Sequence, residues 1–216
     1  MMASHRCFRI GTLTILFGVP VPMRAQVTAS VGPIVGYYRP FGHFDPASVY
    51  TTDLPSEPRD LRGFMAGGAA HLSLGRRFGL ETHVTIAHSS IPAVITPGGP
   101  RGPTKANVDI ATLEGEYDVS PTRQRYRVWL KAGPALERHG GDAYARYGSP
   151  TSVGGAAGAG LTVPLGRRFH FAADVTTLWY VFDLAMPPEL QLNPGRLQHG
   201  AQRDALMQVG LRWGHL

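Results

Sequence analysis

The chain has 216 residues, of which 43% are hydrophobic and only 17% are charged, and it contains 27 glycines and 18 prolines. This length suits one domain preceded by a processed segment, and no apolar run reaches the ~18 residues that a transmembrane helix needs. The formal net charge is +6. Without the first 25 residues, 18 Lys and Arg face 15 Asp and Glu, and so small an excess does not indicate nucleic-acid binding.

The N-terminal segment has the layout of a secretory signal peptide. A short positive region precedes an apolar run at 10–22, which is too short to span a bilayer, and Ala25 is the small residue before the cleavage point. We therefore expect residues 1–25 to be removed and residues 26–216 to form one exported domain. The only cysteine, Cys7, lies in the signal, so the mature chain forms no disulfide. An alternative interpretation makes this segment a buried N-terminal strand.

The rest of the chain alternates between apolar and polar residues with period two, which is typical of β-strands that have two different faces. In the stretch RFHFAADVTTLWYVFD, Phe169 and Trp179 lie on one face and Asp174 lies on the other. Eight such segments are predicted, at 27–38, 62–74, 78–88, 107–119, 125–138, 152–165, 169–183 and 203–214. The Gly- and Ala-rich sixth segment is the weakest, although glycine suits the close backbone approach and bending of a small barrel.

Short and long connections alternate strictly between these segments. Three connections are tight, at 75–77, 120–124 and 166–168, and four are long and polar, at 39–61, 89–106, 139–151 and 184–202. Four long loops would argue against the strands in a compact soluble domain. In a transmembrane β-barrel they are expected.

The strand lengths fit a membrane. Phe169 and Trp179 are ten residues apart on one face, which makes about 33 Å of strand and leaves ~25 Å along the membrane normal at a tilt of ~40°. This height matches the apolar band of a transmembrane barrel. Aromatic residues are predicted at the two membrane interfaces, and they are Phe78, Tyr117, Tyr126, Phe169, Trp179 and Trp213, with Tyr37 beside Trp179 at one rim.

An exported, cysteine-free chain with eight alternating segments, short turns and long loops resembles the small outer-membrane barrels of the OmpA, OmpX and OmpW kind. The resemblance covers residues 27–216 and rests on architecture. It implies an all-β fold, an eight-stranded antiparallel up-and-down transmembrane β-barrel with short periplasmic turns and four long extracellular loops. It also implies an outer-membrane location, a monomer, contact with outer-membrane lipid and lipopolysaccharide, and insertion by the barrel-assembly machinery. Such proteins usually end in an aromatic residue, whereas this chain ends LRWGHL, and we expect Trp213 and Leu216 to substitute.

The polar strand faces are expected to line the interior, which side chains fill in an eight-stranded barrel. Buried charges must be paired. The ion-pair candidates are Glu81, Glu114, Glu116, Arg127, Lys131, Glu137, Asp174 and Arg212, with His71 and His83 on the same faces. A four-residue turn at 120–123 would place Glu116 opposite Arg127. It would also place Glu114 opposite Trp129, with Lys131 on the diagonal. These pairs form either a gate, as the resemblance to OmpA implies, or a static core.

The stretch AHSS at 87–90 sets His88 beside Ser89, and a Ser–His pair is the nucleophilic constellation of acyl hydrolases. Some small outer-membrane barrels are enzymes of this kind that act on lipid A. Adjacent residues on a strand point to opposite faces, however. We therefore expect no Ser–His pair and no enzyme. The sequence has neither zinc-ligand spacing nor a phosphate-binding loop, and we predict no metal and no cofactor.

The pattern favours an integral outer-membrane protein with a structural, adhesive or surface-interaction role and a lumen filled by side chains. Three alternatives stay open. They are a narrow pore or transporter for small apolar molecules, a lipid-modifying acyl hydrolase, and a soluble periplasmic barrel of the lipocalin type.

The pentamer Leu-Gly-Arg-Arg-Phe occurs twice, at 74–78 and 165–169. Its Leu and Phe lie on the apolar face by alternation, and directly paired residues must share a face. A two-residue turn would pair Leu74 with Arg77, so a three-residue Gly-Arg-Arg loop is predicted at both places. The arginines of these turns are then expected at the level of the lipid headgroups, and they are Arg76, Arg77, Arg167 and Arg168.

Overall fold

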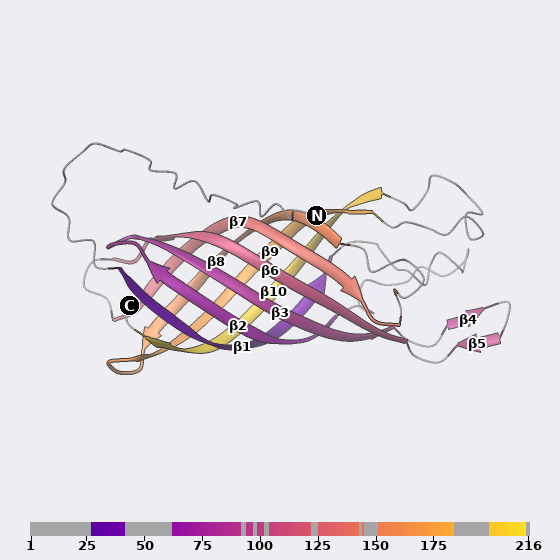
Figure 1. Ribbon diagram of the computed structural model, residues 1–216, viewed down its shortest axis with the longest axis horizontal. Coiled ribbons are helices and arrows are strands. Elements are labelled where there is room, and N and C mark those ends of the chain that lie inside the picture. Colours follow the sequence, from indigo (N-terminus) through magenta and orange to yellow (C-terminus); the bar gives the residue numbers. More distant parts are fainter. Residues whose placement is uncertain are drawn as a thin grey trace, which may run out of the picture.

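Alternating residues on eight segments build a closed barrel in the computed structural model (Figure 1). The structure describes residues 27–41, 62–91, 94–96, 99–101, 104–121, 125–142, 144, 151–183 and 199–214. The barrel strands are β1 (Thr28–Pro40), β2 (Gly63–Ser73), β3 (Phe78–Ile91), β6 (Thr104–Asp118), β7 (Arg127–Gly140), β8 (Thr151–Pro164), β9 (Phe169–Asp183) and β10 (His199–Gly214). Each strand pairs antiparallel with the next, and β1 pairs with β10 to close the barrel. The predicted eight-stranded antiparallel barrel is confirmed.

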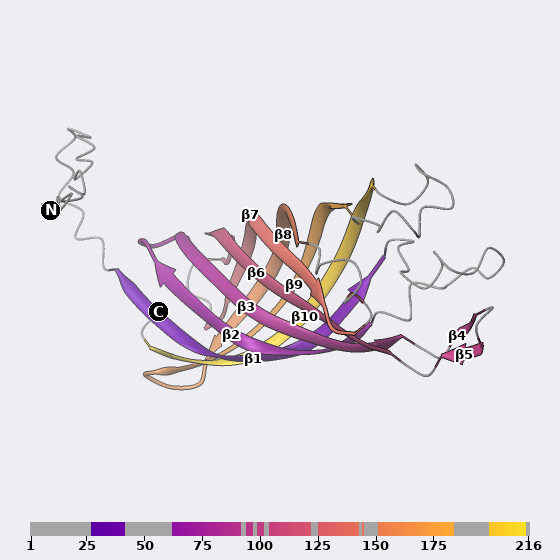
Figure 2. The ribbon, with the colours of Figure 1, turned by 45° about the vertical axis from the view of Figure 1, so that its right-hand side comes forward.

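The two ends of the barrel differ in their connections. At the turn end, residues 74–77, 119–126 and 165–168 join neighbouring strands, and β1 begins and β10 ends there. The opposite end, the long-connection end, carries the four longer connections, which lie mostly outside the described residues, as does the predicted signal peptide. The connection predicted at 89–106 is shorter than expected, because β3 runs on to Ile91 and β6 begins at Thr104. Between them β4 (Val94–Thr96) and β5 (Gly99–Arg101) pair as a small hairpin outside the barrel wall (Figures 1 and 2).

Side chains alternate between the inside and the outside of the barrel, and most of the large apolar ones face outward. In β9, Phe169, Val175 and Trp179 are exposed, whereas His170 and Asp174 are buried. The same sidedness holds along the other barrel strands, where the exposed large hydrophobic residues include Val31, Val84, Leu113, Leu130, Val153 and Leu211. Among the residues that the structure describes, no helix has the length and apolar character needed to cross a membrane.

The two Leu-Gly-Arg-Arg-Phe sequences form matching hairpins of the predicted kind. Leu74 N–H donates to the Phe78 carbonyl at 2.8 Å, and Leu165 N–H donates to the Phe169 carbonyl at 2.8 Å. Gly75 has a φ of 132°, a conformation that disfavours other residues. Each turn also continues the ladder to the following strand, since the carbonyls of Arg77 and Arg168 accept from the N–H groups of Asp118 and Gly214.

The connection between β6 and β7 is longer than the predicted four-residue turn. Val119 N–H donates to the Val128 carbonyl at 2.9 Å, and Val128 N–H donates to Ser120 Oγ at 2.7 Å. Asp118 Oδ1 in turn accepts from Ser120 N–H at 2.8 Å and from its hydroxyl at 2.5 Å. This local network closes the turn around Ser120 and sets the register of the hairpin, so that Glu116 lies opposite Lys131.

Glycines on the inner face let the strands coil tightly. A Cβ on Gly158 of β8 would lie 2.2 Å from the Val175 carbonyl oxygen, and one on Gly133 of β7 would lie 2.0 Å from the Leu113 carbonyl oxygen. Neighbouring backbone therefore occupies the space of a side chain at these positions. This close approach explains how a Gly- and Ala-rich segment forms a regular barrel strand.

The seam between β1 and β10 is interrupted. Val31 lies opposite Trp213 and Ile34 lies opposite Gly210, but Gly32 and Pro33 between them have no paired residue in β10. Pro33 has no N–H to donate, and the backbone of Leu211 lies too close to Gly32 for a side chain there. By contrast, β9 and β10 pair without a break from Asp183 to Phe169.

The interior has two layers. Toward the turn end it is charged, as described below. Toward the long-connection end it is an apolar layer of buried side chains in contact, which include Tyr38, Met65, Ile110, Leu178 and Leu206. Buried side chains therefore occupy the interior at both levels, which agrees with the narrow interior of eight-stranded barrels.

Candidate functional site: the charged barrel interior

The turn-end half of the interior holds an ionic network of eight residues. These are the acids Glu81, Glu114, Glu116 and Asp174, the bases Lys131 and Arg212, and the histidines His71 and His83, and all are buried. They come from β2, β3, β6, β7, β9 and β10, so the network crosses the lumen from wall to wall.

Lys131 lies at the centre of the network. Its Nζ is 3.4 Å from Glu81 Oε2, 3.4 Å from Glu114 Oε2 and 3.1 Å from Asp174 Oδ1. The side chain is fully buried. One ammonium group thus joins carboxylates from three strands, and its three N–H donors match the three acceptors.

A second path across the lumen runs through Gln208. Its amide nitrogen is 3.0 Å from both Asp174 Oδ1 and His83 Nδ1. Since an amide nitrogen only donates, His83 Nδ1 accepts, and the ring proton lies on Nε2. That nitrogen is 3.0 Å from Glu81 Oε1, and Arg212 also pairs with Glu81. Glu81 is therefore bound by a lysine, an arginine and a histidine.

The prediction that Glu116 faces Arg127 is wrong, and so is the placement of Glu114 opposite Trp129. Glu116 lies opposite Lys131 and Asp118 lies opposite Trp129, because the longer turn moves the partner of each residue by four positions. A shift by an even number of residues keeps every side chain on its face but changes its partner. Glu116 instead contacts His71, with 2.9 Å between Oε2 and Nε2.

Arg127 lies at the edge of the interior instead of within the network. Its side chain is 34% exposed, and its Nε is 4.0 Å from Asp118 Oδ2. The guanidinium also lies over the buried Trp129 ring, 5.8 Å from its centroid. Arg127 therefore covers the turn end of the core and pairs only weakly.

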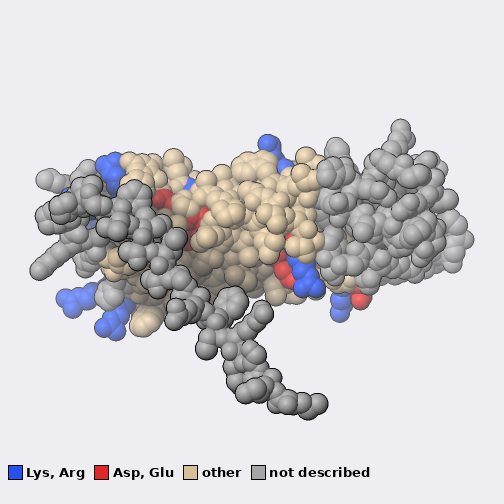
Figure 3. Space-filling model, turned by 45° about the horizontal axis from the view of Figure 1, so that its top comes forward, with Lys and Arg blue, Asp and Glu red and all other residues tan. Residues whose placement is uncertain are grey.

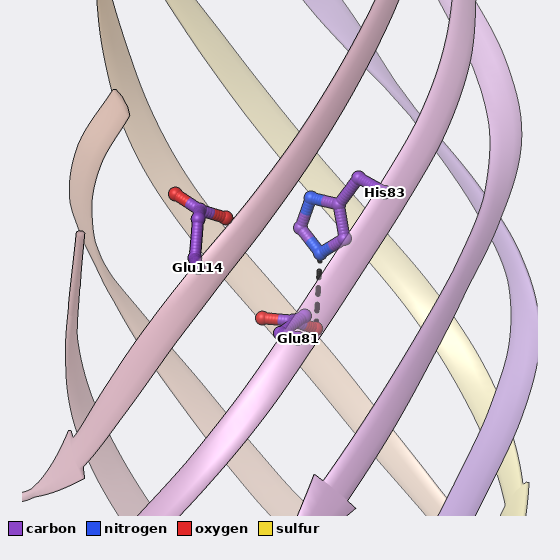
Figure 4. A group of neighbouring side chains, drawn as sticks. All are labelled: Glu81, His83 and Glu114. Carbon is purple, nitrogen blue, oxygen red and sulfur yellow. Dashed lines mark ion pairs between the residues drawn. The ribbon is translucent and has the colours of Figure 1, made fainter. Parts of the chain in front are cut away.

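Three residues of the network have the composition of a metal site. Ligand atoms of Glu81, His83 and Glu114 lie within 4.8 Å of one another, on the adjacent strands β3 and β6 (Figure 4). However, the Lys131 ammonium group already contacts both carboxylates, and Arg212 contacts Glu81 as well. The lysine and arginine side chains therefore already pair with these carboxylates, and a metal ion would have to displace them.

Glu137 belongs to a different cluster, the tyrosine–acid cluster, which lies in the apolar layer. Tyr38 donates to Asp204 Oδ2 at 2.5 Å and lies 3.2 Å from Glu137 Oε1, and Tyr180 donates to Asp204 Oδ2 at 2.7 Å. His139 Nε2 is 3.4 Å from Glu137 Oε1. Asp204, Tyr38 and His139 were not among the predicted site residues. Strand alternation places all three inward, and that pattern is the signal that finds them.

The predicted interface aromatics lie on the outer surface. Phe78 and Tyr117 form a cross-strand pair with 5.2 Å between ring centroids, and Trp213 lies opposite Phe169. These four and Tyr126 lie near the turn end, and Trp179 lies toward the long-connection end. The turn arginines Arg76, Arg77, Arg167 and Arg168 are exposed, and Arg77 donates to the Tyr117 hydroxyl at 3.2 Å, which raises the pKa of Arg77.

The structure does not pair His88 with Ser89. His88 points outward, and its Nδ1 is 3.0 Å from Asn107 Oδ1. Ser89 donates to the Arg62 carbonyl at 3.1 Å. The two side chains lie on opposite faces of β3, and this stretch lacks the geometry of a nucleophile and its base.

No protein-family profile matches the chain, and no curated protein matches it by sequence. Solved structures match it by fold. The crystal structure of the outer membrane protein OprG from Pseudomonas aeruginosa matches with a TM-score of 0.53 at 12% identity, over 88% of this chain and 96% of that one. The crystal structure of Neisserial surface protein A matches with a TM-score of 0.51 at 14% identity, over 87% of this chain and 96% of that one. The chain thus shares the fold of small outer-membrane barrels.

Proposed function

We propose that the protein is an integral outer-membrane barrel with a structural or surface-interaction role and a closed lumen. The sidedness of the barrel carries this proposal. Large apolar side chains are exposed on every barrel strand, while the acids and bases of the ionic network are buried inside. Figure 3 shows uncharged residues across the middle of the barrel and basic side chains toward its ends. Such an apolar belt is costly in water and is the lipid-facing surface of transmembrane barrels.

This sidedness argues against the soluble lipocalin-type alternative, which needs an apolar lumen and a polar exterior. The closed lumen argues against a pore, because the ionic network and the apolar layer fill successive levels of the same interior. The separation of His88 from Ser89 removes the observation that motivated an acyl hydrolase.

Cell fractionation combined with electrophoresis tests the membrane location. We expect the full chain, expressed in a Gram-negative host, to be recovered with outer membranes. Unboiled samples should migrate differently from boiled ones, because the closed barrel resists the detergent. Recovery in the periplasmic supernatant without detergent, with one migration position, would overturn the proposal.

Planar-bilayer recording separates the closed lumen from the narrow pore. The purified barrel should insert and give no discrete conductance steps at any applied potential. Reproducible steps from material with the heat-modifiable shift would replace the proposal with a channel.

For the hydrolase, release of acyl chains from labelled lipid A that is lost in Ser89→Ala would establish an enzyme.

A further inference from the structure

The outer surface of the barrel carries a groove that neither the closed lumen nor the interface aromatics explain. It has a volume of about 740 Å³ and is lined by residues of β1, β2, β8, β9 and β10, most of them with outward side chains. The small residues Ala159 and Ala173 lie within it, and the larger Tyr37 and Met207 flank it toward the long-connection end. A lining of this kind suits a flexible hydrocarbon chain.

Two arginines lie beyond the groove on the same outer face. Arg39 follows Tyr37 by two residues on β1, and it lies opposite Ala205 of β10. Arg203 is two residues from Ala205 and lies opposite Trp179. Phe41 N–H donates to the Arg203 carbonyl at 2.8 Å, so the strands stay joined at this level. The two arginines are therefore diagonal neighbours, with side chains starting about 7–8 Å apart.

Aromatic rings hold both guanidinium groups. The Arg39 Cζ lies 5.3 Å from the Phe41 ring centroid, and the Arg203 Cζ lies 5.9 Å from the Trp179 ring centroid. Cation–π contacts of this kind fix the position of a cation without neutralising it. Neither arginine has an ion pair with a carboxylate anywhere in the described part of the chain. Among the residues that the structure describes, these two oriented positive charges beside an apolar groove thus have no carboxylate partner.

We infer that this face binds one molecule of lipopolysaccharide through its lipid A, with an acyl chain in the groove and phosphate on Arg39 and Arg203. Guanidinium groups bind phosphate through two parallel hydrogen bonds. The two arginines lie toward the long-connection end, which in transmembrane barrels faces the outside, where lipopolysaccharide forms the leaflet. The groove extends from the level of Tyr37 and Phe64 past the middle of the barrel. The inference rests on the proposed membrane location, and it adds a specific site to it.

Native mass spectrometry of the mature barrel in a neutral detergent tests the site. Lipid A is titrated against the wild type, the double variant Arg39→Gln/Arg203→Gln, and Ala173→Leu, which fills the groove. The matched control is Arg138→Gln, because Arg138 is an exposed arginine near the same end on β7. All four should retain the heat-modifiable shift, since every changed side chain faces outward.

We expect the double variant to weaken lipid A binding by about tenfold or more, the scale of a lost charge-assisted contact. Ala173→Leu should weaken it also, and Arg138→Gln should not. Dephosphorylated lipid A should bind the wild type as weakly as lipid A binds the double variant. An equal loss in Arg138→Gln, or equally tight binding of phosphatidylglycerol, would overturn the inference. If either of these two results is found for a barrel that fractionates with outer membranes, the lipid A site is refuted and the membrane location still holds.

Discussion

Lys131 shows how a single residue organises the interior. Its ammonium group lies between Glu81, Glu114 and Asp174, and its side chain is fully buried. Each of these carboxylates would be unstable at this depth without a positive partner. The residue therefore matters less for the energy of one pair than for the three charges that it compensates at once.

Replacement of this lysine should be severe. Lys131→Met keeps the length of the side chain and removes its charge, which leaves three buried carboxylates with less compensation. We expect a loss of about 3–5 kcal/mol, the usual cost of breaking a buried ion pair. The free energy of unfolding in urea, measured in micelles by the heat-modifiable shift, gives the value. Lys105→Met on the outer surface is the control, and equal stability of the two variants would contradict a central role.

Arg127 should behave in the opposite way. Its side chain is a third exposed and its contact with Asp118 is long, at 4.0 Å, so solvent screens the pair. Arg127→Ala should cost about 1 kcal/mol or less in the same urea titration. A loss as large as that of Lys131→Met would restore a buried partner for Arg127 and would contradict the register found between β6 and β7.

At the scale of elements, sequence and structure agree best where strand alternation alone decides the answer. The faces of β9 and the paired Leu-Gly-Arg-Arg-Phe hairpins follow from parity, because any wrong register would turn apolar residues inward. Parity cannot distinguish registers that differ by an even number of residues, here four. The β6–β7 register depends on hydrogen bonds of Asp118 and Ser120 that no periodicity encodes, and for this reason the partner of Glu116 was predicted wrongly.

The inner-face glycines give a test of strand coiling. A Cβ at Gly158 would meet backbone at 2.2 Å, whereas one at Gly160 in the same strand finds its nearest atom at an ordinary 3.4 Å. Gly158→Val should therefore cost about 1–3 kcal/mol, as overpacking does. Gly160→Ala should be neutral or slightly stabilising, since glycine weakens strands. Urea titration compares the two, and tolerance of valine at Gly158 would show that β8 does not need its close approach to β9.

At the scale of the whole molecule, the interior is closed at two successive levels, by the ionic network toward the turn end and by the apolar layer toward the long-connection end. The charged residues of the turn-end half could be predicted from the sequence, because strand alternation places them on the inward face, where charges must be paired. The inward positions of the tyrosine–acid cluster follow from the same alternation, but its contacts could not be predicted, since only closure of the barrel brings Tyr38 to Asp204. Because ion pairs close one level of the lumen and apolar packing closes the other, a single substitution is not expected to open both.

This arrangement predicts that a breach of one layer does not create a channel. The double variant Leu178→Ala/Leu206→Ala removes large buried side chains from the apolar layer, and each change should cost about 2–5 kcal/mol. Planar-bilayer recordings of the folded variant should still lack conductance steps, because the ionic network spans the lumen below the cavity. Steps in this variant would mean that the apolar layer alone seals the barrel.

The interrupted seam also has a consequence for the order of assembly. β1 and β10 come from opposite ends of the chain, so their pairing closes the longest loop and costs the most entropy. The gap beside Pro33 removes hydrogen bonds from the same pairing, while β9 and β10 pair without a break. The seam should therefore be the last ladder to form and the first to open. In deuterated buffer, the amide protons of β1 that face β10 should exchange sooner than those shared by β9 and β10.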